Sequence, residues 1–181
     1  MNKLLVYGIG NPYRRDDAVG IRVAQRLAKE IKTNDIDVKW GSIDGIAILD
    51  EIVGYQRVIF IDSIKTKDGN PGNIYKINPE SFKNSHSFSS HGINFVTALE
   101  FGKKFDLDMP ERIDVYAIEI EDNDTFSEEC TPRVAAVIPK LVEEIIRQTK
   151  AIHGNSRQLK TDEDSEEQDD SRAFSDENAG H

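Results

Sequence analysis

The sequence predicts a single α/β domain of three layers, with helices on both faces of a mostly parallel, twisted sheet of about five strands. Three observations support this prediction. Short apolar runs of strand length alternate with longer segments of helical periodicity, which is the pattern of βαβ units. The first apolar run ends in a glycine turn that leads into an amphipathic segment. A chain of 181 residues is also long enough to bury one substantial core.

The first part of the chain contains two strand patterns and two helix patterns. Residues 4–7 are apolar throughout, as expected of a buried parallel strand. Within residues 18–31 apolar side chains recur every four positions and basic side chains face away, which predicts an amphipathic helix. Residues 36–40 alternate like a half-exposed strand, and residues 46–53 have the apolar spacing of a short helix.

The later part continues the alternation. Residues 58–61 are apolar throughout and predict a central parallel strand that ends there. Residues 72–77 predict a short edge strand that can be antiparallel, and residues 87–94 precede a helix. Residues 113–117 predict another strand. Thr131 then opens a long amphipathic helix as its N-cap, with a proline in the first turn, where a missing N–H costs nothing.

The C-terminal part differs in composition from the rest. Residues 155–181 contain nine acidic and three basic residues, and they include few side chains that could be buried. Such a composition favours disorder. We therefore expect a folded domain over residues 1–154 and a disordered acidic tail over residues 155–181, which most simply is a solvated appendage and alternatively an autoregulatory arm.

Charge and cysteine content exclude several classes of function. A formal charge of -10 and a pI near 4.9 argue against binding to nucleic acid or to an anionic membrane. Cys130 is the single cysteine, so an internal disulfide is excluded and a reducing, cytoplasmic compartment is expected. No run of about 18 apolar residues exists, so we expect no membrane span. No predicted helix carries a surplus apolar face, which favours a monomer.

The glycine turn after the first strand is the most informative segment. Gly8 and Gly10 suggest a dinucleotide-binding G-x-G-x-x-G motif, but its third glycine falls at Tyr13. Asp16 and Asp17 stand where a pyrophosphate would approach the helix, and their charge would repel it. The pair suits a cation or a peptide instead. The alternative is that one of them merely caps the helix.

Two further candidates belong to the same edge of the predicted sheet. Asp62 directly follows the strand at residues 58–61, at the carboxyl edge where open α/β sheets place their sites. His91 lies at or near the start of the next helix. Two carboxylates and one imidazole there could form a site for zinc, nickel or manganese with open positions. Alternatively, Asp62 stabilises a turn and His91 is a surface residue, and His86 competes for any role of His91.

Three blocks of the sequence, taken in order, resemble the hydrogenase maturation protease family. They are residues 16–20 (DDAVG), 58–64 (VIFIDSI) and 89–93 (SSHGI), and the similarity extends from about residue 3 to residue 148. The resemblance implies that Asp17, Asp62 and His91 are the catalytic, metal-binding residues.

A fourth block, residues 41–45 (GSIDG), resembles the family's glycine-containing loop beside the site. It implies a role of Asp44 and Gly45 in substrate recognition.

The resemblance also implies an activity. We expect an aspartyl-type endopeptidase that removes a C-terminal extension from the nickel-loaded precursor of a hydrogenase large subunit. The nickel is carried by that substrate protein, and other divalent metals such as zinc or cadmium could occupy the site. Two alternatives stay open at this point: a Rossmann-like nucleotide-binding protein, and a related α/β peptidase of the spore germination protease type.

Overall fold

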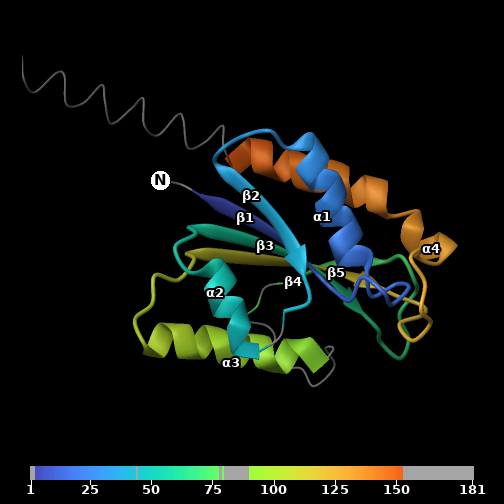
Figure 1. The fold of residues 1–181 in the computed structure, drawn as a ribbon, viewed down its shortest axis with the longest axis horizontal. Helices are drawn as coiled ribbons and strands as arrows, with labels where there is room; N and C mark the ends of the chain where they lie inside the picture. Colours follow the sequence, from blue (N-terminus) through green and yellow to red (C-terminus); the bar gives the residue numbers. More distant parts are fainter. Residues whose placement is uncertain (1–2, 44, 78, 80–89, 153–181) are drawn as a thin grey trace, which may run out of the picture. The chain divides into compact units, whose positions relative to one another are not determined.

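A computed structural model of the chain describes residues 3–43, 45–77, 79 and 90–152, with backbone alone for residues 90–94 (Figure 1). The chain falls into two compact units, Met1–Glu143 and Glu144–His181, and the sheet with the helices α1, α2 and α3 belongs to the first. The predicted domain boundary at residue 154 lies outside the described residues and stays a prediction. Within the described residues, none of the helices has the length and apolar character needed to cross a membrane.

The first unit contains the predicted five-stranded, mostly parallel sheet. Its strands lie in the order β2-β1-β3-β5-β4, and β4 at the edge is antiparallel to β5. The strands are β1 (Leu4–Ile9), β2 (Ile36–Gly41), β3 (Arg57–Ile64), β4 (Ile74–Ile77) and β5 (Arg112–Glu119). The predicted strand patterns, including the antiparallel edge strand, are thus confirmed.

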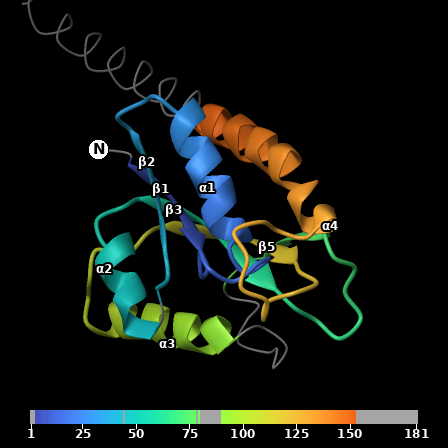
Figure 2. The same ribbon diagram turned by 45° about the vertical axis from the view of Figure 1, so that its right-hand side comes forward.

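Helices cover both faces of the sheet, which confirms the three-layer prediction (Figure 2). One face carries α1 (Val19–Glu30), which contacts β1, β2 and β3. The other face carries α2 (Ile48–Ile52) and α3 (Ser90–Lys104), with the short 3₁₀ helix η1 (Gly45–Ala47) before α2.

The chain continues after β5 with a helix that is broken once. Its first turn, α4 (Pro132–Ala135), starts after Thr131 as predicted, and a separate helical stretch covers residues 138–152. Residues 136–137 form a turn between them, so the single long helix predicted from Thr131 is wrong in this detail.

The core on the α2 and α3 side is built from the alternate residues of the strands. Because successive strand side chains point to opposite faces, every second residue of β1 and β3 packs here. The ring of Phe60 meets that of Phe95 edge-on, with centroids 5.1 Å apart. The cluster consists of Leu5, Tyr7, Ile9, Ile48, Leu49, Ile52, Val58, Phe60, Phe95, Ala98 and Val115.

Strand β3 is longer than the sequence predicts. The apolar run ends at Ile61, but the strand continues through Asp62 to Ile64. Pairing with β1 stops at Ile61, whereas pairing with β5 goes on to Ile64. The last three residues therefore continue past the part of β3 that pairs with β1, with Asp62 partly buried and Ser63 and Ile64 buried. Asp62 thus lies inside the strand and not directly after it, and the alternative that it only stabilises a turn is not supported.

Candidate active site

The position of Asp17 is fixed by contacts within the turn between β1 and α1. Gly10 has a φ of 154°, and a Cβ there would lie 2.0 Å from the Asp17 carbonyl oxygen, so only glycine allows this close approach. The Asp17 carboxylate accepts a hydrogen bond from the Asn11 backbone N–H (2.8 Å) and another from the Ser63 hydroxyl (2.8 Å). The first βα turn and the end of β3 are therefore joined at Asp17.

Ser63 bonds to both candidate carboxylates. Its hydroxyl donates to Asp17, and its backbone N–H donates to Asp62 Oδ1 at 2.8 Å. Since neighbouring residues of a strand point to opposite faces, Ser63 faces α1 and Asp62 faces the layer that contains α2 and α3. The structure thus brings Asp17 and Asp62 to the same end of β3, as the sequence predicts.

The topology explains why Asp17 and Asp62 lie at the same edge of the sheet. The chain leaves β1 through α1 on one face and reaches β3 through α2 on the other, so the strand order reverses between β1 and β3. Ligand sites of open α/β sheets lie at such reversal points, outside the carboxyl ends of the strands. Asp17 follows β1 and Asp62 lies at the end of β3, one on each side of this point.

The other predicted site residues are described less fully. His91 is the second residue of α3, as predicted, and α3 covers the face toward which Asp62 points, but the His91 side chain lies outside the described residues. Asp44 and His86 also lie outside them. Among the described residues, no three His, Cys, Asp or Glu side chains gather closely enough to hold a metal.

Gly45 opens η1 with a φ of 57°. Its loop is tied to the glycine turn at Gly10, whose N–H donates to the Gly41 carbonyl (3.3 Å) and whose carbonyl accepts from the Ser42 hydroxyl (2.6 Å). The loop after β2 therefore starts directly beside the turn that holds Asp17.

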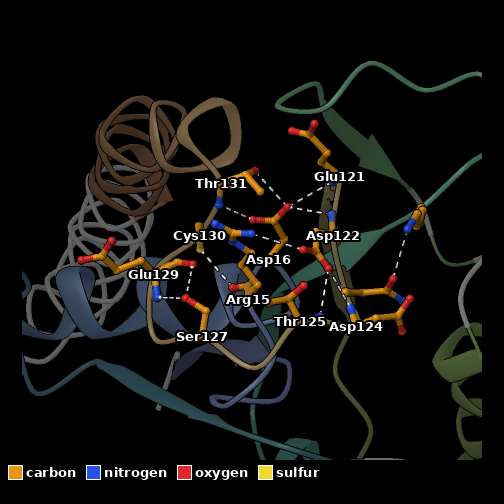
Figure 3. Close-up of polar contacts among 12 residues, drawn as sticks. Arg15, Asp16, Glu121, Asp122, Asp124, Thr125, Ser127, Glu129, Cys130 and Thr131 are labelled. Carbon is orange, nitrogen blue, oxygen red and sulfur yellow. Dashed lines mark hydrogen bonds and ion pairs between the residues drawn. The ribbon is translucent and has the colours of Figure 1, made fainter.

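Neither acidic residue of the turn caps α1. The N-cap is Ala18, and it is not joined by a side-chain capping bond. Asp16 is completely buried, and its carboxylate is hydrogen-bonded to the loop that follows β5 (Figure 3). The capping alternative is therefore wrong, and the two neighbouring carboxylates have different surroundings.

The geometry of the turn also argues against a bound dinucleotide. The Asn11 N–H, which a phosphate would need, already donates to Asp17. The glycines serve packing instead, because a Cβ on Gly8 would lie 2.3 Å from the Gly20 carbonyl oxygen. The close approach of α1 to the sheet thus accounts for the glycine pattern.

Cys130 does not act as a nucleophile in this arrangement. Burial raises the pKa of its thiol and the nearby Asp16 carboxylate adds to this effect, although Arg22 opposes it. The thiol is protonated at neutral pH, and it donates to the Arg15 carbonyl oxygen. A cysteine peptidase mechanism is therefore not supported.

The described donors suit a divalent cation. One Asp17 oxygen accepts from the Asn11 N–H and the other from the Ser63 hydroxyl, whereas a carboxylate has about four acceptor positions in all. Hydrogen bonds of this kind orient the carboxylates that bind metals. Asp17 and Asp62 can therefore contribute oxygen ligands while their orientation is held by the protein.

Fold and site together define a three-layer α/β protein with a pair of carboxylates at the strand-order reversal, which is where enzymes of this architecture bind their substrates. The chain belongs to the hydrogenase maturation protease family, because the model of that family (HycI, hydrogenase maturation protease) matches residues 21–148. The match includes Asp62 and His91 and begins shortly after Asp17. Membership of this family makes the chain a peptidase.

Known proteins of similar sequence and fold agree with this assignment. The hydrogenase 2 maturation protease of Escherichia coli K12 is 25% identical over 150 residues, which cover 80% of this chain and 88% of that protein. The structure of the E. coli hydrogenase maturating endopeptidase HybD has a TM-score of 0.71 at 22% identity and covers 82% of this chain and 93% of that one. The [NiFe] hydrogenase maturation protease HycI of Thermococcus kodakarensis has a TM-score of 0.64 at 24% identity, with 80% and 90% covered. The nucleotide-binding and germination protease alternatives are not favoured by these matches.

Proposed function

We propose that this protein is an endopeptidase that removes a C-terminal extension from the nickel-loaded precursor of a hydrogenase large subunit. The observation that carries the proposal is the family match across Asp62 and His91, combined with the hydrogen bonds that join Asp17 and Asp62 through Ser63. The relative named hydrogenase 2 maturation protease supports this choice of substrate class.

The proposal assigns Asp17, Asp62 and His91 as metal ligands and as the catalytic residues of an aspartyl-type endopeptidase. The metal is nickel that arrives with the precursor, and zinc or cadmium can take its place. Carboxylate oxygens and imidazole nitrogen suit such divalent ions. A cation bound there supplies Lewis acidity, which polarises a carbonyl and makes water more acidic.

The protein's own residues hold the carboxylates in place. The Ser63 hydroxyl and the Asn11 N–H both donate to Asp17, which keeps this carboxylate oriented. Asp62 points to the face covered by α3, on whose first turn His91 lies. The precursor's metal would thus meet ligands from both sides of β3.

We further propose that Asp44 and Gly45 contribute to substrate recognition. The supporting observation is a pair of hydrogen bonds, from the Gly10 N–H to the Gly41 carbonyl and from the Ser42 hydroxyl to the Gly10 carbonyl, which keep the start of this loop beside the turn that holds Asp17. A precursor segment that reaches Asp17 would pass close to the loop.

The compartment and the oligomeric state are part of the proposal. The single cysteine fits a reducing compartment, which for this function is the cytoplasm. We propose that the enzyme acts as a monomer on its precursor protein.

Nickel dependence is the direct test of the function. The purified full chain is incubated with the unprocessed large subunit, either loaded with nickel or free of it, and release of the C-terminal peptide is followed by mass spectrometry. We expect release only from the nickel-loaded precursor, since the metal completes the site. Equal cleavage of both forms would refute the nickel requirement, and cleavage of neither form of a matched precursor would refute the function.

A Ser63→Ala variant tests whether the hydroxyl positions Asp17. The variant loses one hydrogen bond to a charged group, and we expect the cleavage rate to fall about tenfold or more, as for other groups that orient metal ligands. Ser63→Thr keeps the hydroxyl and is expected to retain most activity. The free energy of unfolding, measured by urea titration, separates a local effect from loss of fold. An unchanged rate in Ser63→Ala would show that this bond is dispensable.

A further inference from the structure

The buried carboxylate of Asp16 is saturated by donors from a distant loop. Oδ1 accepts from the Thr131 backbone N–H at 2.6 Å, and Oδ2 accepts from the Thr131 hydroxyl at 2.9 Å (Figure 3). Oδ2 also accepts from the backbone N–H groups of Glu121 (3.1 Å) and Asp122 (3.0 Å). A buried carboxylate is tolerated only when it is bonded in this way. The Asp16 carboxylate therefore points toward the loop after β5.

The same loop is also hydrogen-bonded to the backbone of the residues just before Asp17. The N–H of Arg15 donates to the Thr125 carbonyl at 3.0 Å, and that of Asp16 donates to the Asp122 carbonyl at 3.0 Å. The N–H of Ser127 donates to the Tyr13 carbonyl at 3.1 Å. Residues 121–131 are called the brace below. Their backbone runs beside residues 13–16 and is hydrogen-bonded to it.

An ion pair and an internal turn stiffen the brace. The Arg15 guanidinium lies 3.4 Å from Asp122 Oδ2. Bonds from Thr125, then from the Asp124 N–H and from Arg15, hold the pKa of the Asp122 carboxyl well below its usual range. The ionised Asp122 therefore fixes the loop conformation that presents its own backbone N–H to Asp16.

We propose that Asp16 is a positioning residue, which fastens the brace to the βα turn and thereby holds the adjacent Asp17 carboxylate at Asn11 and Ser63. The main chain of Asp17 has little freedom of its own, because its carbonyl packs against Gly10. Because residues 13–16 lead directly into Asp17, a shift of this segment would move the Asp17 carboxylate away from Asn11 and Ser63. The importance of this placement for metal binding rests on the proposed function.

Amide hydrogen exchange and Ni²⁺ binding by the full chain test the proposal. The variants are Asp16→Asn, Thr131→Val and the conservative control Thr131→Ser. In Asp16→Asn an NH₂ group must face a backbone N–H in either orientation, since N–H groups approach both oxygens. We expect the Asn11 amide, which reports the bond to Asp17, to exchange about tenfold faster, and Ni²⁺ affinity to fall about tenfold. Thr131→Val should also speed exchange at Asn11 and weaken Ni²⁺ binding, but by less than Asp16→Asn. Thr131→Ser should match the wild type in both measurements.

The amide of Leu27 in α1 serves as the reference for the fold as a whole, and we expect its exchange to be unchanged. A folded Asp16→Asn variant with wild-type exchange at Asn11 and wild-type Ni²⁺ affinity would overturn the proposal. If Asp16→Asn does not fold, Thr131→Val decides by the same two measurements. If the wild-type chain alone binds no free Ni²⁺, because the metal enters only with the precursor, exchange at Asn11 decides the role of Asp16: wild-type exchange there in Asp16→Asn would overturn it.

Discussion

Replacing Asp17 by asparagine is expected to reduce precursor cleavage by about 10²–10⁴-fold while the protein stays folded. The amide oxygen can still accept from the Asn11 N–H, and the Ser63 hydroxyl can turn to accept from the amide nitrogen. The hydrogen bonds are thus largely kept, but the negative charge that attracts a cation is lost. The rate of peptide release from nickel-loaded precursor is the measurement.

A matched control is available on α2. Asp50→Asn changes the same charge at an exposed position away from the turn, so cleavage and stability should both stay near the wild-type values. Asp62→Asn is expected to behave like Asp17→Asn, because both carboxylates are proposed as ligands of the same metal. Rapid cleavage by either site variant would remove that carboxylate from the proposed mechanism.

The fold was predictable because apolar periodicity reflects local burial. The apolar run at residues 58–61 lies at the centre of the sheet, and the four-residue spacing between 18 and 31 gives a helix whose apolar side packs on the strands. The antiparallel edge strand was also recognisable, because residues 72–77 are short and bounded by turn-forming residues. Each of these signals is contained in a window of fewer than fifteen residues.

The different surroundings of Asp16 and Asp17 were not predictable in the same way. Both are aspartates in one turn, and the difference arises from partners about 105–115 positions away in the chain. Ser63 is a comparable case. It is an ordinary residue after an aspartate in the sequence, and only the approach of β1 and β3 reveals that it reaches Asp17. The length of β3 likewise depends on β5, which continues pairing after β1 has ended.

The sequence did predict that Asp17 and Asp62 lie at the same edge of the sheet, for a topological reason. A polar residue at the carboxyl end of a central strand, and another in the first βα turn, must lie at one edge of a parallel sheet. His91 follows the same logic through its place on α3. Its side chain, like Asp44, lies outside the described residues, so its participation stays a prediction.

Gly20→Ala is expected to destabilise the protein by about 3 kcal/mol or more, because α1 packs directly against the backbone of the sheet. A Cβ on Gly20 would lie 2.4 Å from the carbonyl oxygens of both Ile9 and Ile61. Those oxygens belong to β1 and β3, and these strands cannot move away from α1 without breaking the hydrogen bonds between them. Alanine favours a helix over glycine by only about 1 kcal/mol, so the collision outweighs the gain in helix propensity.

Urea unfolding of Gly20→Ala beside the exposed α1 control Arg26→Ala measures this cost, and the control should change stability by less than about 0.5 kcal/mol. Stability equal to or above that of the wild type in Gly20→Ala would show that α1 can move away from the sheet at little cost. A folded fraction of Gly20→Ala should also cleave poorly. Displacement of α1 carries Asp17 away from Ser63, and the bond between these two residues is what joins the βα turn to the end of β3.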